Sequence, residues 1–135
     1  MLISTKGTNA IRALTDMANN GGEEKYICIS CMSSRLNISR KYLECIMTLL
    51  AKNNLVDVAH GKCGGYKLNR KPEEYSLLDI LIVTEDKIQT VSCPCLEEKT
   101  CTEKNTCVAI EPYKELHDLI INYLGNKTIK DLMNK

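Results

Sequence analysis

Three cysteines in the second half of the chain recur at equal intervals, and their thiols are the side chains best suited to bind a metal. Cys95, Cys101 and Cys107 follow a C-x5-C-x5-C spacing, and Cys93 stands just ahead of them. The residues between them are almost all polar, so this segment gains little free energy by burying itself. Metal binding can supply the missing folding energy. Cysteine ligands without a nearby histidine favour an iron–sulfur cluster or a zinc ion.

A disulfide loop is the alternative use of these thiols, and it requires an oxidising compartment. Residues 1–7 show no basic region followed by a long apolar one, so they do not resemble a secretory signal. No apolar run approaches the length that crosses a membrane. We therefore expect a cytoplasmic protein that makes no membrane contact. Because cytoplasmic thiols stay reduced unless they bind metal or do redox work, a metal is favoured over a disulfide.

A second cysteine pair, Cys28 and Cys31, has the C-x2-C spacing of half a zinc site or of a redox pair. No second C-x2-C pair and no thioredoxin-like pattern follows, which favours free thiols that are buried or half-buried. Cys45 lies in a helical segment nearby, and we expect it to be buried among small apolar residues as well. Cys63 lies in a glycine-rich segment that we expect to face a partner.

The charge of the chain is divided unequally between its two parts. The 135 residues carry a net charge of +1, enough chain for one domain with a small appendage. Residues 1–75 hold 11 Lys or Arg against 7 Asp or Glu, whereas residues 76–135 hold 7 against 10. The first part is therefore at +4 and the second at −3. A basic first part favours a polyanionic partner for that part alone.

The elements that must position these residues begin with helices. Residues 7–19 place apolar side chains at helical spacing, and a second, short helix is expected from Ser30 or Cys31 to about Asn37. A third helix is expected from Arg40 to Lys52, with Ser39 as its N-cap. Its apolar stripe consists of Leu43, Ile46, Met47 and Leu50. Two helices joined by a short turn predict a helix-turn-helix, whose second helix enters a DNA major groove. A helical hairpin without DNA binding is the alternative.

The segment after the third helix favours DNA binding. Residues 55–59 and 66–69 read as two strands, and the glycine-rich residues 60–65 read as the tip of a hairpin. A hairpin directly after a recognition helix is a wing, whose glycines allow close approach to a phosphate backbone. Residues 30–71 also carry eight Lys or Arg against two acids. Such a basic concentration supplies non-specific affinity for a duplex.

The C-terminal part of the chain predicts a helix with an unusual amount of apolar surface. A short helix is expected after Ser76, and the longer one runs from about Pro112 to Leu124, with Gly125 directly after its end. The longer helix is apolar on several neighbouring faces, so we expect it to pair with a second copy of the chain. Packing within one subunit is the alternative. Thr128 opens a last, short helix.

Catalytic chemistry has little support in this sequence. We find no nucleophile beside a base, no recognisable pair of carboxylates and no cofactor fingerprint. The segment 61–65 lacks the spacing and the Ser or Thr of a nucleotide-binding loop. We therefore do not expect an enzyme, and a purely structural zinc protein is a minor alternative.

Taken together, these segments resemble the Rrf2 family of bacterial transcription regulators, and the resemblance covers nearly the whole chain. The matching segments, beside the cysteine triad, are Ile3–Gly7, Ala10–Leu14, Ile38–Glu44, Leu55–Val56, Gly61–Leu68 and Thr128–Leu132. The resemblance implies dimers that bind pseudo-palindromic operators in double-stranded DNA through a winged helix-turn-helix. It also implies that the cysteine loop holds a 2Fe–2S or 4Fe–4S cluster, as in many members of the family.

The chain departs from the family pattern at the fourth cluster ligand. Ile110 stands where the iron–sulfur regulators have a histidine, and Thr8 stands where the nitric-oxide-sensing type has an aspartate. Two further departures are Tyr113 for a tryptophan and His60 for the basic residue of the wing tip. The fourth ligand therefore stays open between Cys93, His117, an exogenous thiol and a residue of the other subunit.

These observations combine into one expectation for the molecule, which is a mainly α fold with a small β-hairpin wing. A winged helix-turn-helix is expected over residues 1–84, a cysteine-bearing cluster loop over 85–108, and a dimerisation helix with a C-terminal helix over 109–135. The residues expected at DNA are Ser39, Arg40, Lys41, Tyr42, Glu44, His60, Lys62, Gly64 and Gly65. The expected function is a dimeric, DNA-binding transcription regulator under iron–sulfur control. The alternative is a cluster-free repressor of the same family, controlled by a partner protein or by cysteine oxidation.

Overall fold

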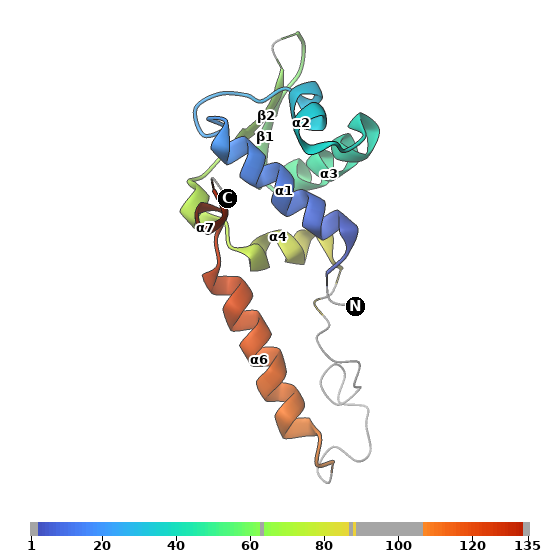
Figure 1. The fold of residues 1–135 in the computed structure, drawn as a ribbon, viewed down its shortest axis with the longest axis vertical. Helices are drawn as coiled ribbons and strands as arrows, with labels where there is room; N and C mark the ends of the chain where they lie inside the picture. Colours follow the sequence, from blue (N-terminus) through green and yellow to red (C-terminus); the bar gives the residue numbers. More distant parts are fainter. Residues whose placement is uncertain (1–2, 63, 87, 89–106, 134–135) are drawn as a thin grey trace.

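The computed structural model describes residues 3–62, 64–86, 88 and 107–133. Helices and a two-stranded hairpin follow one another along the chain (Figure 1). Their bounds are α1 Thr5–Asn19, α2 Ile29–Leu36, α3 Arg40–Lys52, β1 Val56–Ala59, β2 Gly65–Leu68, the 3-10 turn η1 Pro72–Glu74, α4 Leu77–Thr84, α6 Ile110–Asn126 and α7 Ile129–Leu132. The expected class, mainly α with a hairpin wing, is confirmed.

The core forms where the apolar stripes of α1 and α3 meet. Leu14 and Met17 of α1 and Leu43 and Leu50 of α3 are fully buried. Residues from other elements complete this cluster, among them Met32, Tyr75, Ile80 and Ile129. Each stripe repeats every three to four residues, so one side of each helix is buried and the other is left to solvent.

The helix-turn-helix consists of α2, a short turn and α3. Asn37 ends α2 in the left-handed conformation, with φ of 54°, which asparagine tolerates better than most residues. The hydroxyl of Ser39 then accepts a hydrogen bond of 3.2 Å from the backbone N–H of Tyr42 and caps α3. Arg35 of α2 and Asp16 of α1 form a two-pronged ion pair of 2.7 and 2.9 Å, which holds α2 against the core.

The wing is a hairpin that pairs with the segment before α2. In the antiparallel register Val56 faces Leu68 and Ala59 faces Gly65. Ile27 adds a bridge to Tyr66, with hydrogen bonds of 2.7 and 2.9 Å in the two directions. This bridge is formed two residues before α2 begins. The wing is therefore fixed to the N-terminal side of the helix-turn-helix.

Helix α6 projects from the rest of the described chain, and the wing lies at the opposite end of the molecule (Figure 1). It packs against α4, while α7 returns to the core through the fully buried Ile129. The capping boxes expected at Ser76 and Thr128 are both present. The expected end of α6 before Gly125 is wrong, because the helix continues to Asn126 and has Lys127 as its C-cap. Gly125 is therefore a helical residue and not the left-handed residue that often follows a helix.

Candidate nucleic-acid interface

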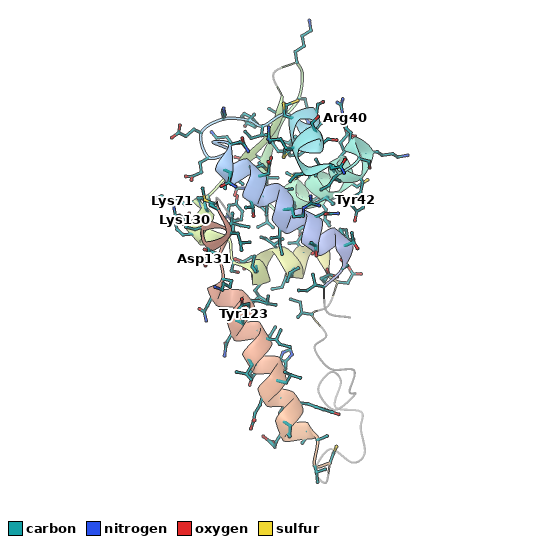
Figure 2. The ribbon with its side chains drawn as sticks, in the orientation of Figure 1. Arg40, Tyr42, Lys71, Tyr123, Lys130 and Asp131 are labelled. Atoms are coloured by element: carbon teal, nitrogen blue, oxygen red, sulfur yellow. The ribbon has the colours of Figure 1, made fainter. Side chains whose placement is uncertain are left out.

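The first turns of α3 present polar side chains to solvent beside its buried stripe. Arg40, Lys41, Tyr42 and Glu44 are all exposed, whereas Leu43 is fully buried. The cap that Ser39 provides fixes the direction in which these side chains leave the helix. Figure 2 shows Arg40 and Tyr42 on the helix-turn-helix, far from Tyr123 on α6. The N-terminal half of α3 is therefore free to enter a groove.

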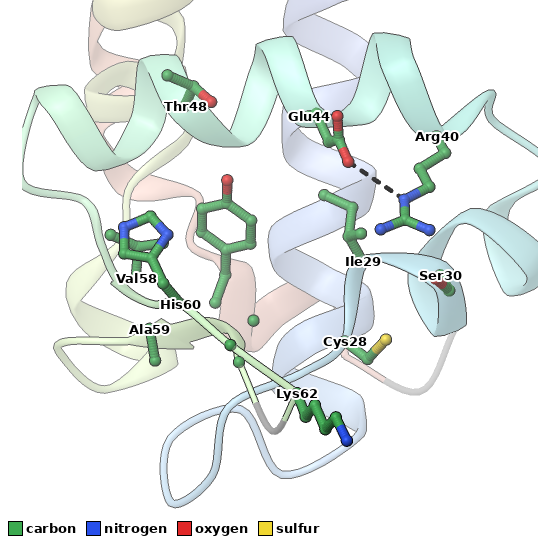
Figure 3. Close-up of a pocket in the computed structure, with 14 residues that line it drawn as sticks. Cys28, Ile29, Ser30, Arg40, Glu44, Thr48, Val58, Ala59, His60 and Lys62 are labelled. Carbon is green, nitrogen blue, oxygen red and sulfur yellow. Dashed lines mark hydrogen bonds and ion pairs between the residues drawn. The ribbon is translucent and has the colours of Figure 1, made fainter.

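A concave surface lies between α3 and the wing (Figure 3). It brings together six of the residues expected at DNA, two from α3 and four from the wing, together with residues from the beginning of α2. The six residues are Arg40, Glu44, His60, Lys62, Gly64 and Gly65. Ser39, Lys41 and Tyr42 lie outside this concavity, on other sides of the first turn of α3. The surface thus joins the helix and the wing into one continuous face.

Sequence reasoning missed other residues of the same surface. Thr48, Ser30 and Cys28 line it beside the predicted residues. Thr48 follows Glu44 by four residues, so helical periodicity alone would have found it. Ser30 and Cys28 carry no such signal, because they reach the surface only through the bridge between Ile27 and the wing.

An ion pair links two residues of this face. The Nε of Arg40 donates to Oε1 of Glu44 at 3.2 Å, with 64% of the arginine side chain and 49% of the glutamate side chain exposed. Such an exposed pair contributes about 0.3–0.5 kcal/mol to helix stability. Its importance is electrostatic, because the carboxylate offsets the positive charge of Arg40 where a phosphate or a base would approach.

Some of the basic residues counted between 30 and 71 have structural partners instead. Arg35 is held by Asp16, as described above. Arg70 lies with its guanidinium carbon 5.1 Å from the centre of the Tyr75 ring and donates to the carbonyl of Asn54 at 3.0 Å. These two cations stabilise the fold, so the charge available to a duplex is concentrated on α3 and on the wing.

The fold itself requires a glycine at position 65. Its φ is +156°, and a Cβ atom there would clash with the carbonyl oxygen of Ile27. The wing strand passes so close to the segment before α2 that only glycine fits.

Comparison with known proteins now identifies the fold and its role. The family described as Rrf2, iron-dependent transcriptional regulator, matches residues 3–135. The chain belongs to the Rrf2 family. Members of this family are transcription regulators that bind DNA, and the expectation that the chain is not an enzyme is confirmed by its relatives.

Proteins similar in sequence to this Rrf2 chain include bacterial transcription regulators. It is 28% identical to the transcriptional regulator IscR of Pectobacterium atrosepticum over 134 residues, which are 99% of this chain and 80% of that protein. It is 31% identical over 137 residues to an HTH-type transcriptional regulator of Haemophilus influenzae, covering all of this chain and 88% of the other.

Solved structures of two Rrf2 regulators resemble it throughout. The IscR of T. potens superposes with a TM-score of 0.74 at 25% identity, covering 98% of this chain and 85% of that one. The global cysteine regulator CymR of B. subtilis gives a TM-score of 0.72 at 26% identity, covering 98% and 95%. The winged helix-turn-helix is thereby confirmed as the fold.

Of the cysteines expected to bind a metal in this Rrf2 chain, only Cys107 lies within the described residues. It is half-buried, three residues before the start of α6. Cys93, Cys95 and Cys101 lie outside them. Across the described ranges, no three Cys, His, Asp or Glu side chains are grouped closely enough to hold a metal ion. Within the same ranges, no helix is long and apolar enough to cross a membrane.

The remaining cysteines correct an expectation. Cys28, Cys31 and Cys45 were expected to be buried or half-buried, and all three are exposed free thiols. Cys28 occupies the N-cap position of α2 without a side-chain capping hydrogen bond, and Cys31 lies in the first turn. Both are exposed, because Ile29 and Met32 take the buried positions of α2. Cys45 lies on α3 between positions of the buried stripe. Cys63 lies outside the described residues.

Proposed function

We propose that this Rrf2 regulator binds a pseudo-palindromic operator as a homodimer, and that an iron–sulfur cluster of the 2Fe–2S or 4Fe–4S type controls the binding. Cys95, Cys101 and Cys107 would hold the cluster. The observation that carries the proposal is the position of Cys107 three residues before α6, which carries more exposed large apolar side chains than any other described helix. Any change at this thiol therefore acts directly on the start of the helix through which we expect the dimer to form.

In this proposal α3 enters the major groove and the wing follows the phosphate backbone or the minor groove. The N-terminal residues of a recognition helix contact base edges. Arg40 is suited to a guanine, and Glu44 can accept from the amino group of a cytosine. Lys41 and Tyr42, which lie outside the concavity, would contact base edges or the flanking phosphates. His60 and Lys62 would contact the backbone beside the wing, where Gly64 and Gly65 permit close approach.

The exposed apolar side of α6 supports the homodimer. Leu119 is 67% exposed, Tyr123 61% and Leu116 44%, and the three side chains share one side of the helix. Packing within one subunit, which is the alternative, involves a different side of α6, where Leu124 is buried. In a two-fold symmetric dimer the same surface meets itself, which suits a single apolar stripe. The two copies of α3 would then contact half-sites about 34 Å apart.

The donors of this chain fit a cluster held mainly by thiolates. Thiolates are the usual protein ligands of iron–sulfur clusters, which respond to oxidants through their own redox chemistry. The two family positions for the fourth ligand carry other side chains in this chain. Ile110 is buried and has no donor atom, and Thr8 is exposed on α1. Cys93, His117, an exogenous thiol and a residue of the other subunit stay as candidates for the fourth ligand.

A cluster-free regulator is the second candidate, and one observation favours it. The position of the family's histidine ligand is occupied by the apolar Ile110, which packs in the fold. In that case a partner protein or oxidation of Cys95, Cys101 and Cys107 would control DNA binding.

Anaerobic reconstitution tests the proposal. Wild-type protein, Cys101→Ser and Cys107→Ser are reconstituted with iron and sulfide, and iron content and visible absorption are measured. A duplex selected from a random pool then serves to compare the loaded and metal-free forms. We expect a coloured wild type, loss of most iron in both variants, and different affinities for the two forms. A full cluster spectrum in Cys101→Ser would contradict the assignment, and equal affinities would favour the cluster-free candidate.

A further inference from the structure

Two exposed thiols lie at the beginning of α2, outside the cysteine loop. Cys28 is the N-cap residue of this helix, and Cys31 is its third residue. Residues three apart at the start of a helix are neighbours on its surface, and the Cys31 side chain is close enough to Cys28 to lower its pKa. A disulfide requires such closeness, with Cα atoms about 4.4–6.8 Å apart. Both thiols are open to solvent, so a reagent can reach them. Burial, which makes most free cysteines inert, does not apply here.

The start of a helix favours the negative form of a thiol. The backbone N–H of Cys31, and next that of Ser30, lower the pKa of Cys28 to about 7, with further help from the hydroxyl of Ser30. The sulfur of Cys28 makes no capping hydrogen bond in this structure. A large part of this thiol is therefore ionised at neutral pH. A thiol whose pKa lies near the ambient pH is the best attacking group for disulfide exchange.

The surroundings of Cys28 carry charged side chains from α3 and from the wing. It shares the concave surface with Arg40 and Glu44 of α3 and with His60 and Lys62 of the wing. Figure 3 shows Cys28 and Ser30 at the start of α2, with Arg40 on one side and Lys62 on the other. The two cations favour a thiolate here, Glu44 opposes it, and His60 favours it only when protonated.

We propose that Cys28 and Cys31 form a thiol–disulfide exchange site for low-molecular-weight disulfides. The Cys28 thiolate attacks one sulfur of the small disulfide, whose S–S bond breaks and releases one thiolate. Cys31 then gives its proton to solvent and attacks the sulfur of Cys28, which releases the second thiolate. Two protein thiols lose two electrons in total and become a disulfide, and the small disulfide becomes two thiols.

The chain allows each thiol to be followed separately. Trypsin cleaves after Lys25 and Arg35, so the peptide 26–35 contains Cys28 and Cys31 and no other cysteine. The peptide 42–52 contains Cys45 alone. Reduced full-length protein is incubated anaerobically with glutathione disulfide, the remaining thiols are trapped with N-ethylmaleimide, and the peptides are measured by mass spectrometry.

We expect peptide 26–35 to become two hydrogens lighter and to carry no maleimide. In Cys31→Ser the first step has no second thiol to follow it, so the peptide should carry one glutathione on Cys28. In Cys28→Ser the attacking thiolate is absent, and Cys31 should stay largely trapped by maleimide. Cys45→Ser is the matched control, since it removes an exposed thiol of the same domain and should leave peptide 26–35 unchanged.

The pH dependence separates this site from ordinary exposed thiols. The alkylation rate of Cys28 should reach half of its maximum near pH 7, as its pKa requires. The proposal is overturned if peptide 26–35 stays fully trapped by maleimide. It is also overturned if Cys31→Ser carries no glutathione on Cys28.

A consequence for DNA rests on the proposed function. A thiolate at Cys28 and a phosphate compete for the same cations, so duplex DNA should slow alkylation of Cys28 several-fold, and Lys62→Ala should lose much of this protection. Calf-thymus DNA serves as the probe. If exchange occurs without protection by DNA, the exchange site stands and the placement of DNA at this face is wrong. If exchange itself fails, the proposed operator binding is unaffected.

Discussion

The Nε atom of Arg40 lies 3.2 Å from Oε1 of Glu44, one turn further along the recognition helix. The pair is open to solvent, so its contribution to stability is small. It nevertheless holds the guanidinium against α3 in the free protein. In the proposed complex, a phosphate or a guanine that binds Arg40 would have to replace the carboxylate, which would couple binding to the loss of this ion pair.

Removing the arginine should weaken operator binding. Arg40→Ala is expected to cost about 1–3 kcal/mol if the side chain contacts a guanine, and less if it contacts only phosphate. Fluorescence anisotropy with the selected duplex measures the change. Lys130→Ala is the control, because this exposed lysine lies on α7, outside the concave surface. Unchanged affinity in both Arg40→Ala and Lys41→Ala would show that α3 is not the recognition helix.

Removing the charge of Glu44 should affect the affinity for DNA and the specificity for one base pair in different ways. Glu44→Gln removes a negative charge from the face, so non-specific binding should strengthen by less than about 1 kcal/mol. Discrimination at one base pair should fall by about 1–3 kcal/mol if the carboxylate accepts from a cytosine. Competition between the selected duplex and calf-thymus DNA measures both effects. Weaker binding to both DNAs would contradict this role for Glu44.

Lys62 of the wing should contribute to the affinity for DNA of any sequence. Lys62→Ala is expected to lower affinity for every duplex and to reduce the slope of affinity against salt by about one unit, because one phosphate contact is lost. Titrations at several salt concentrations give the slope. A slope equal to that of the wild type would mean that Lys62 does not contact phosphate.

A charge on the exposed stripe of α6 should separate the subunits. Leu119 is 67% exposed in the single chain, so Leu119→Asp should affect the folding of the subunit little. We expect monomers by light scattering and much weaker operator binding. Lys114→Asp places the same carboxylate on the opposite side of α6, at another exposed position, and should stay dimeric. If Leu119→Asp is still a dimer, the interface lies elsewhere.

A buried hydroxyl should contribute to stability. Tyr75 is fully buried, and its hydroxyl donates to the carbonyl of Leu55 at 2.6 Å. Tyr75→Phe leaves this carbonyl without its partner, so the free energy of unfolding in urea should fall by about 1–3 kcal/mol. The control is Tyr26→Phe, at a tyrosine that is 40% exposed. An equal change in both variants would contradict the importance of the buried hydrogen bond.

The same tyrosine predicts a dependence on alkaline pH. Burial raises the pKa of Tyr75 above its ordinary value of 10.0. The neutral hydroxyl is therefore favoured in the fold, so its contribution is complete below pH 10 and is lost as the pH rises through the higher folded value. Tyr75→Phe should lose this part of the alkaline destabilisation, measured by urea unfolding across that range.

Much of the fold could be predicted from the sequence because it depends on local periodicity. The stripe Leu43, Ile46, Met47 and Leu50 is buried as expected, since a helix that repeats every 3.6 residues has one apolar side. The capping boxes at Ser76 and Thr128 and the bounds of α3 follow from side chains within a few residues of each other. The basic face of the helix-turn-helix was predictable for the same reason.

The tertiary structure alone decided which distant residues meet. The bridge between Ile27 and Tyr66 brings the start of α2 beside the wing, and it thereby adds Cys28 and Ser30 to the concave face. It also decided that Cys28, Cys31 and Cys45 are exposed, because neighbouring apolar residues occupy the core positions of their helices. Periodicity states which side of a helix is apolar. How far that side is covered depends on the packing of elements remote in sequence, and the same packing leaves the apolar stripe of α6 uncovered.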